Sequence, residues 1–279
     1  YAFIWQNNKK DFLFNGNNLN NNIEFDHYLQ RLGYKYKNTN NELGGYIILK
    51  NKKITFIKDV GDSPEKKFSS NYQSGSLSFE ILSNGKKLIT NSGYFQNFDH
   101  QLNRLSKTSA THSTLVLNDT SSCKFTKNSD SCSIISQGLK IVKKKIVFEK
   151  NYWKIRAAHD GYFKQYGVIH DRDVEFYPEQ MKFIGYDNII SKNKIKNLKF
   201  EIRFHLEPNT KVMRTKDNKS ILIDLDGEGW KFSSFNNNID IDNGLYFGKK
   251  NSFIYNQNIF ITGMTNNENQ TIKWEITKL

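Results

Sequence analysis

The chain has 279 residues, of which 37% are hydrophobic and 14% aromatic, and its formal net charge is +13. This length allows one large all-β unit or two ordinary domains, and the 21 Phe and 14 Tyr supply much of the apolar surface that a packed core needs. No apolar run approaches the length of a membrane span, so we expect no membrane-spanning helix.

The basic charge suits an acidic partner, such as nucleic acid, anionic lipid or an acidic polysaccharide. Lys and Asn also recur in nearly every predicted loop (NNKK, NNLNNN, KNTNN). A compositional bias of this kind raises the charge without building a binding face, and we favour it as the main cause. The Lys run at 143–145 lacks the interleaved aromatic residues of a single-strand binder, so we expect no nucleic acid partner.

The N-terminal segment contains the one predicted helix. The chain opens with YAFIWQNNKKDFLFNG, in mid-pattern and without the pattern of a signal peptide, as we expect of a piece of a longer protein. Residues 23–32 (IEFDHYLQRL) place their apolar side chains near one face of a helix, with Asn22 as its cap and Gly33 at its end.

From Gly44 onward the period of the hydrophobic pattern is two. Short apolar or alternating runs are bounded by Gly, Asn, Asp or Ser at intervals of about eight to twelve residues, which predicts antiparallel sheets rather than βαβ units. We therefore expect an all-β fold, a large antiparallel β-sandwich of two sheets with one short N-terminal helix. The predicted strands are GYIILK, KKITFIKD, GSLSFEIL, KKLITNSG, STLVLND, LKIVKKKIVFEK, YWKIRAAHD, VIHDRDVEFY, MKFIGYD, KFEIRFHLEP, SILIDLD, GWKFSSF, SFIYNQNIFITG and TIKWEIT.

One window concentrates side chains that exchange protons or bind sugars. The chain has only 6 His, yet the stretch AAHDGYFKQYGVIHDR contains His159, Tyr162, His170 and Arg172. Two strands joined by a hairpin-like connection bring His159 near His170 and Arg172, with the tyrosine in the loop. The alternative, which composition favours, is structural: a His bonded to backbone at a strand end, and Arg172 paired with Asp160 or Asp173.

Two further histidines lie at or near predicted strands. His205 shares one strand face with Arg203, and this face is either a polar groove or, as we favour, the solvent side of a half-buried sheet. His112 directly precedes the apolar strand 115–117, so we expect it at a strand entrance, where loops converge on a rigid scaffold.

Several familiar site chemistries are missing. There is no GxSxG elbow, phosphate-binding GxxxxGK[ST] loop, HExxH motif or Rossmann glycine signature. Cys123 and Cys132 flank a loop-like segment without zinc-binding spacing. They either close a hairpin disulfide in an oxidising compartment or remain free thiols, so they do not decide the compartment.

Four blocks together resemble a known family. They are SGSLSFEILSNGKKLITNSG, RLSKTSATHSTLVLNDTSS, AAHDGYFKQYGVIHDRDVEF and RFHLEPN. In this order and spacing they resemble the C-terminal β-domain of the heparinase II/III-like proteins, most closely the uncharacterised branch found in alphaproteobacteria. The resemblance runs from about Phe12 to the C-terminus. It implies that residues 1–40 are a strand and helix linker from a missing N-terminal α/α-toroid domain, and that 41–279 form the sandwich.

The resemblance also implies a reaction. In characterised members the toroid and the sandwich form a cleft for an acidic polysaccharide, which is cleaved by β-elimination. Much of that machinery, including a Tyr acid/base, belongs to the toroid. The family is bacterial, and the protein is then expected in the periplasm or the cytoplasm. The resemblance adds weight to the four residues of the window as groups that line the groove.

The metal site of active family members is altered in this chain. Their sandwich resembles His-x-His-x-Asp before a Ser-Phe-Glu strand, followed by Asp-x-Gly and a later His. By this resemblance Asn71 stands in place of a catalytic His, Gln73 in place of a metal-binding His, Gly75 in place of the Asp, and Asn91 in place of the second Asp. Only His112 is retained. Amides are poor zinc ligands, so we expect that the structural zinc is lost.

We therefore expect the C-terminal β-sandwich of a polysaccharide lyase acting on uronate-containing glycans, inactive as an isolated fragment. Asn71 hydrogen-bonds the sugar carboxylate in this interpretation, because an amide is no base near neutral pH. The alternative is a non-catalytic glycan-binding or scaffold domain of cell-envelope metabolism that has lost the metal site.

Overall fold

The computed structural model describes residues 12–14, 28, 31–33, 41–128, 132–191, 197–248, 252–266 and 268–279. Nearly all regular structure in this part is β. The strands are β1 (Glu42–Leu43), β2 (Tyr46–Lys50), β3 (Ile54–Asp59), β4 (Phe79–Ser83), β5 (Lys86–Ile89), β6 (Leu115–Leu117), β7 (Lys124–Lys127), β8 (Ser133–Gln137), β9 (Ile141–Phe148), β10 (Trp153–His159), β11 (Val168–Tyr177), β12 (Lys182–Ser191), β13 (Lys199–His205), β14 (Lys211–Arg214), β15 (Ser220–Leu225), β16 (Glu228–Ser234), β17 (Asn238–Tyr246), β18 (Ile254–Met264) and β19 (Gln270–Lys278). The short helices are η1 (Lys66–Phe68), α2 (Gln101–Ser106), η2 (Ser109–Thr111) and α3 (Phe163–Tyr166).

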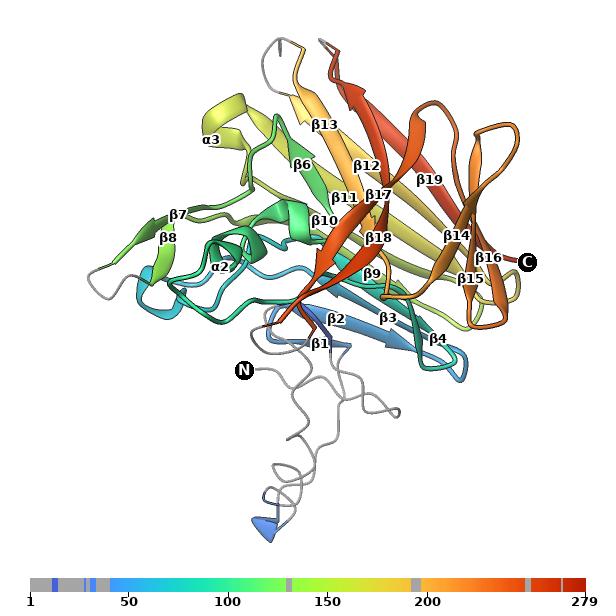
Figure 1. Cartoon of the computed structure of the whole chain (residues 1–279), viewed down its shortest axis with the longest axis horizontal. Coiled ribbons are helices and arrows are strands. Elements are labelled where there is room, and N and C mark those ends of the chain that lie inside the picture. Colours follow the sequence, from blue (N-terminus) through green and yellow to red (C-terminus); the bar gives the residue numbers. More distant parts are fainter. Residues whose placement is uncertain are drawn as a thin grey trace.

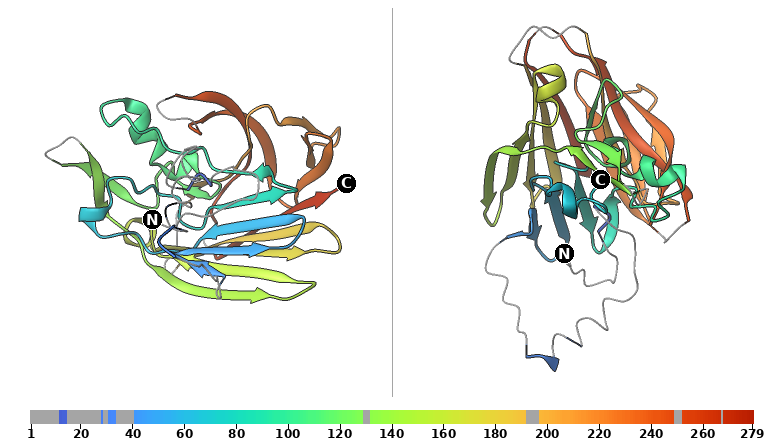
Figure 2. Two further views of the ribbon diagram at one scale, coloured as in Figure 1. Left: turned by 90° about the horizontal axis from the view of Figure 1, so that it is seen from below. Right: turned by 90° about the vertical axis from the view of Figure 1, so that its left-hand side faces the viewer.

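Three antiparallel sheets form two packed layers (Figure 1). One layer is the eight-stranded sheet, in the order β14-β15-β16-β19-β12-β11-β10-β9. The other combines the five-stranded sheet β1-β2-β3-β4-β5 with the four-stranded sheet β17-β18-β13-β6, and an isolated bridge between Thr90 and His205 joins the two. The separate β7–β8 hairpin projects from the body of the sandwich (Figure 2).

Aromatic rings hold the layers together. Phe79 of β4 stacks on Trp274 of β19 with ring centroids 5.5 Å apart, and Phe204 of β13 meets the same indole edge-on at 4.9 Å. Phe56 of β3 contacts Phe183 of β12 at 5.8 Å. Because each buried ring removes a large apolar area from water, both smaller sheets are fastened to one face of the eight-stranded sheet.

The period of two decides which side chains face the second layer. Along β10 the apolar positions point inward, whereas Lys154 and Arg156 reach the outer face and pair with carboxylates of β11. On β12, Gly185 lies opposite Trp274, where a Cβ would approach the indole Cζ2 to 2.0 Å. A glycine is therefore required at this point for the indole to lie flat against the strand.

A short upstream segment completes the core. Leu13 is fully buried, and its backbone N–H donates to Oε1 of the buried Glu80 at 2.8 Å. The ring of Phe14 lies 5.0 Å from that of Tyr46 on β2. Residues well before β1 in the sequence are thus structural parts of the sandwich.

The predicted all-β sandwich is confirmed, and each predicted run contains a strand at its expected place. The strands β1, β7, β8, β14 and β17 were not predicted. The first four are short, from 2 to 5 residues, whereas the alternation at 238–242 of β17 was a usable signal. The segment after Cys123 is accordingly a strand rather than a loop. The helix expected at 23–32 falls mainly outside the described residues. No helix in the described part is long and apolar enough to cross a bilayer.

Candidate functional site

The loop between η1 and β4 carries Asn71 to the surface. Tyr72 donates its backbone N–H to the Ser69 carbonyl at 3.1 Å, and Gly75 donates to the Gln73 carbonyl at 2.8 Å, so the chain turns twice within a few residues. Asn71 is exposed, whereas Gln73 and Gly75 are buried beneath it. The loop presents one amide side chain outward from a packed base.

His112 lies below this loop, at the entrance to β6, as predicted. It is buried, and burial lowers its pKa to about 3, so the ring is neutral. A Cβ on Gly75 would lie 2.7 Å from His112 Nδ1. Within the described part, neither ring nitrogen of His112 nor the hydroxyls of Ser76 and Ser78 have a protein hydrogen-bond partner. We name the following residues the His112 cluster: Gln73, Gly75, Ser76, Ser78, Asn91 and His112.

The His112 cluster does not fit the zinc site that the family resemblance implies. Asn91 is occupied at both ends of its amide, because Oδ1 accepts from the Ser113 N–H at 2.9 Å and Nδ2 donates to Glu80 Oε1 at 3.1 Å. Gly75 has no side chain, and the His112 ring fills the space where one would begin. No group of three or more His, Cys, Asp or Glu suited to a metal gathers among the described residues. One neutral imidazole with amides is a poor ligand set for Zn²⁺.

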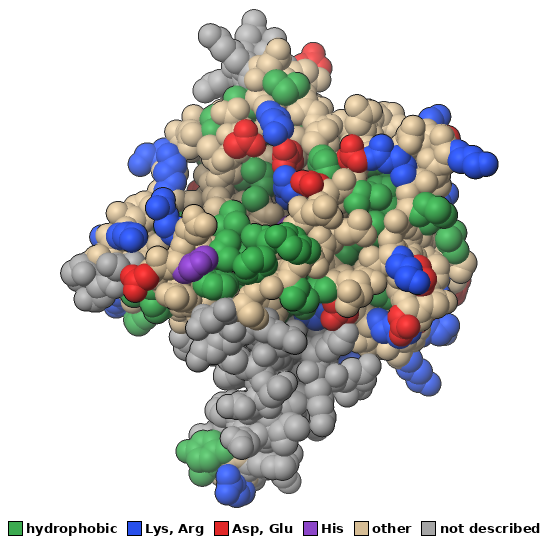
Figure 3. All heavy atoms as spheres, viewed as in Figure 1, with side chains coloured by type: hydrophobic (Ala, Val, Ile, Leu, Met, Phe, Trp, Pro, Cys, Tyr) green, Lys and Arg blue, Asp and Glu red, His purple; other side chains and the backbone are tan. Residues whose placement is uncertain are grey.

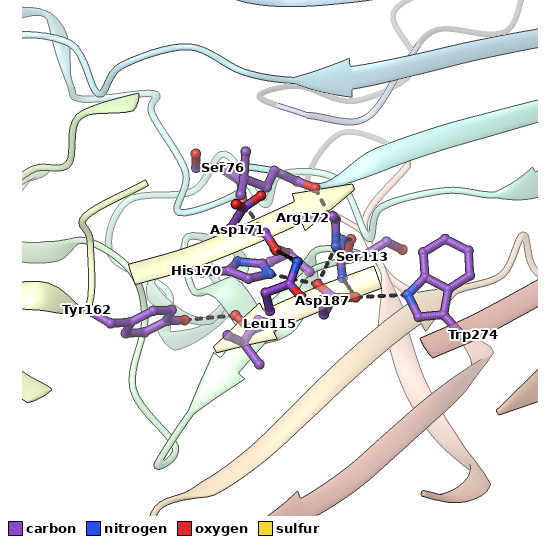
Figure 4. A network of polar contacts seen from close by, with 12 residues as sticks. Ser76, Ser113, Leu115, Tyr162, His170, Asp171, Arg172, Asp187 and Trp274 are labelled. Atoms are coloured by element: carbon purple, nitrogen blue, oxygen red, sulfur yellow. Dashed lines mark hydrogen bonds and ion pairs between the residues drawn. The ribbon is translucent and has the colours of Figure 1, made fainter. Parts of the chain in front are cut away.

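The two strands of the predicted window meet as expected. His159 on β10 and His170 on β11 are register partners, and their rings lie edge to face with centroids 5.3 Å apart. Arg172 donates through Nε to Asp187 Oδ1 at 2.6 Å and through Nη2 to Oδ2 at 3.1 Å (Figure 4). His170 Nε2 and Trp274 Nε1 also donate to this carboxylate, at 2.7 and 2.8 Å. We name these residues the Arg172 network: His159, His170, Arg172, Asp187 and Trp274.

The Arg172 network contains one internal ion pair with neutral neighbours. Burial alone would raise the pKa of Asp187, but the Arg172 guanidinium and the N–H of His170 hold it well below its usual value. Burial lowers the pKa of His159 and of His170, so both rings are neutral near pH 7. The charge of Arg172 is balanced by Asp187, and the remaining lone pairs of that carboxylate are filled by neutral donors.

The four side chains of the predicted window do not line a groove, which corrects the expectation from the sequence. Four of them are only 0–1% exposed: His159, Tyr162, His170 and Arg172. Alternation along a strand does not distinguish a face on solvent from a face on another sheet, and here the inward face of β10 and β11 lies against the second layer. The partner of Arg172 is Asp187 on β12 rather than Asp160 or Asp173.

The Arg172 network supports the Asn71 loop from behind. Arg172 Nη1 donates to the Ser113 carbonyl at 2.6 Å and to the Leu77 carbonyl at 3.2 Å. The Tyr162 hydroxyl donates to the Leu115 carbonyl at 2.8 Å. Leu77 ends the loop that carries Asn71, and Ser113 follows His112. The window therefore acts on the surface loop by holding its backbone.

His205 is also buried, so the preference for a solvent-facing position is wrong. Its Nδ1 lies 3.1 Å from Ser92 Oγ and its Nε2 lies 3.0 Å from the Ala110 carbonyl. The segment after β5 covers the end of β13 and encloses His205. Cys123 and Cys132 are free thiols, the first of them buried.

Basic side chains lie on the elements that adjoin the Asn71 loop. Lys66 on η1, Arg104 on α2, and Lys124 and Lys127 on β7 are exposed. None of these four forms an ion pair with a carboxylate of the described residues. Several Lys and Arg side chains and one acidic side chain lie along the left margin of the face in Figure 3, where β7 and β8 lie in Figure 1. This edge of the sandwich is suited to an anion.

Comparisons with known proteins agree on one relationship. The model of the heparinase II/III-like C-terminal domain matches residues 39–275. The chain belongs to the heparinase II/III-like family. The matched region contains the Asn71 loop, the His112 cluster and the Arg172 network. No curated protein sequence matches the chain.

Solved structures of heparinases share the fold of this family member. The heparan sulfate lyase HepC from Pedobacter heparinus superposes with a TM-score of 0.77 at 13% identity, over 97% of this chain and 44% of that chain. A crystal structure of heparinase III gives a TM-score of 0.71 at 16% identity, over 99% of this chain and 45% of that chain. This chain spans less than half the length of the solved proteins it matches.

Sequence reasoning missed several of the residues that build the site. Asp187 lies in phase with the buried Phe183 of β12, and a charge at an inward position was a usable signal for a buried partner. Lys58 is fully buried and donates through Nζ to the Arg172 carbonyl at 2.7 Å; burial, and next Arg172, lowers its pKa to about 7. Lys107 lies in a Ser-Lys-Thr sequence that predicts an ordinary solvated loop, and nothing in the sequence indicates its burial.

Proposed function

We propose that this domain is the C-terminal sandwich of a polysaccharide lyase that cleaves acidic, uronate-containing glycans by β-elimination. In this reaction the uronate carboxylate is neutralised, a base removes the C5 proton, and the bond from C4 to the linking oxygen breaks as the double bond forms. The observation that carries the proposal is the exposed amide of Asn71. It stands on a loop braced from behind, beside unpaired basic side chains, in a chain of the heparinase II/III-like family.

The role we assign to Asn71 is to bind and orient the sugar carboxylate. Its Nδ2 is a neutral donor, and a hydrogen bond to a charged acceptor is stronger than one between neutral groups. An amide does not accept a proton near neutral pH, so Asn71 is not the base. The base and the acid are then expected from the toroid domain that the family resemblance implies.

A non-catalytic glycan-binding or scaffold domain is the second candidate. Two observations favour it: an amide stands where the resemblance implies a catalytic imidazole, and the His112 cluster does not fit zinc. In that case the same surface binds an acidic glycan of the cell envelope, and no bond is cleaved.

The deciding experiment incubates the longer protein with a panel of uronate polysaccharides and follows the ultraviolet absorbance of the unsaturated product. Product formation supports the lyase, and glycan binding without product supports the binding module. We expect Asn71→Ala to weaken binding about 10- to 100-fold, as for one hydrogen bond to a charged group, and Asn151→Ala at the exposed β9–β10 turn to have no effect. If the longer protein neither binds nor cleaves any glycan of the panel, both candidates are contradicted.

We also propose that this domain has no structural zinc. Metal analysis of the purified chain is expected to find less than stoichiometric zinc. Stoichiometric zinc that survives dialysis would mean that Gln73 and Asn91 rearrange to bind it.

A further inference from the structure

Lys107, at the C-terminal cap of α2, is a buried cation without a carboxylate partner among the described residues. Its Nζ donates to the carbonyls of Ser70 and Ser133, the second at 2.7 Å. The same ammonium lies 5.7 Å from the ring centroid of Tyr94 and 5.2 Å from that of Phe125. Two carbonyl oxygens and two aromatic faces therefore replace the water that a lysine normally keeps.

This arrangement is costly for a residue that serves only packing. Burial lowers the pKa of Lys107 to about 8, which measures how poorly the site tolerates the charge relative to water. A methionine would fill a similar volume without that cost. The particular contacts of the ammonium therefore need an explanation.

The contacts converge on the Asn71 loop from both sides. Lys107 Nζ holds the Ser70 carbonyl just before Asn71, and the Lys107 carbonyl accepts the Ser74 N–H at 2.9 Å just after it. The Tyr94 hydroxyl adds a second, longer bond to the Ser70 carbonyl at 3.4 Å. One residue thus fixes the two ends of the short segment from which the Asn71 side chain projects.

We propose that Lys107 is a positioning residue, which clamps the loop so that the Asn71 amide meets an anionic sugar in a fixed orientation. This role rests on the proposed function of Asn71. It extends that function because it assigns the geometry of the binding loop to a buried side chain that never touches the glycan. The contact with Ser133 ties the β7–β8 hairpin, with Lys124 and Lys127, to the same clamp.

The test compares Lys107→Met with Lys145→Met, an exposed lysine on β9, in the chain and in the longer protein. Amide hydrogen exchange is expected to rise about 10- to 100-fold in residues 70–74 of Lys107→Met, as for loss of a charged hydrogen bond, and to stay unchanged in β10–β12. Lys145→Met is expected to leave exchange in 70–74 unchanged. If exchange in that segment is equally slow in both variants, the proposal that Lys107 clamps the loop is wrong. If Lys107→Met does not fold, Lys107→Gln, which stays polar but is too short to reach Ser70, replaces it.

Glycan affinity then separates positioning from general stability. If Lys107 acts through Asn71, the double variant Lys107→Met/Asn71→Ala binds no more weakly than Asn71→Ala alone. Losses that multiply in the double variant overturn the positioning role. If the unmodified longer protein binds no glycan, the proposed function fails, while hydrogen exchange still decides whether Lys107 clamps the loop.

Discussion

The Arg172 network and the His112 cluster are neighbours between the same two layers, and both are removed from water. In the first, a full charge on Arg172 is balanced by Asp187, and every oxygen of that carboxylate has donors. In the second, the described protein groups leave both nitrogens of His112 and two serine hydroxyls without partners. The same depth of burial therefore accommodates two different kinds of polar group.

The difference follows from what each group costs to bury. An ionised side chain without a partner is far more expensive in the interior than a neutral one, so Arg172 fixes its surroundings more strictly than His112 does. The residue types that make a window look catalytic in a sequence are the same ones that an internal ion pair needs. Here they build the support, and the surface group is an asparagine that only the family resemblance singles out in the sequence.

The largest effect is expected from breaking the ion pair. Arg172→Met leaves Asp187 buried without its cation, which we expect to lower the free energy of unfolding by about 3–5 kcal/mol. Arg156 is the matched control, because it makes a similar two-point contact with Asp171 on the outer face of the same sheet. Arg156→Met is expected to cost at most about 1 kcal/mol. Denaturant unfolding measures both variants. Equal losses would show that the buried pair contributes no more to stability than the pair on the outer face.

A pair of histidine variants sharpens the comparison. His170→Leu removes a donor from the Asp187 carboxylate and is expected to cost about 1.5–3 kcal/mol of unfolding free energy. His112→Leu removes a ring that bonds no described protein group, and we expect a loss below about 1 kcal/mol. Thermal unfolding of both variants tests this order, and a larger loss for His112→Leu would contradict it.

The most gradual effect is the dependence of stability on pH, because it is spread over several pH units. Four buried histidines have lowered pKa values, to about 3 for His112 and His205, against 6.5 for an unperturbed ring. Below pH 6.5 the unfolded chain binds protons that the folded protein does not, so stability falls as the pH drops from 6.5 toward 3. Each ring contributes at most about 1.4 kcal/mol per pH unit.

Two buried carboxyls act in the opposite direction over part of this range. Burial raises the pKa of Asp59 to about 7 and also raises that of Glu80, so both take up protons earlier in the folded protein than in the unfolded chain. With four histidines against two carboxyls, the net slope is still a loss of stability on acidification. Unfolding measured at a series of pH values checks the sign of this dependence, and His112→Leu should flatten the curve of stability against pH. Stability that does not change between about pH 6 and 4 would contradict the expected net loss on acidification.

The strands and the pairing of the window were predictable from the sequence, because the period of two fixes which residues share a face. His159 and His170 meet across the hairpin as that period predicts. The pattern did not reveal that a second layer covers this face, because a polar face in water and a polar face against another sheet show the same alternation. The burial of His205 and of Lys107 depends on segments distant in the sequence, which no local pattern places.

The bond from the Leu13 N–H to Glu80 has a consequence for where this domain begins. The family match starts at residue 39, yet a buried carboxylate on β4 takes one of its donors from a residue much closer to the N-terminus. A version of the domain cut at the start of the match would leave Glu80 with one donor fewer and uncover the apolar surface beneath Leu13 and Phe14. The core of the sandwich therefore includes a segment that precedes the matched region in the sequence.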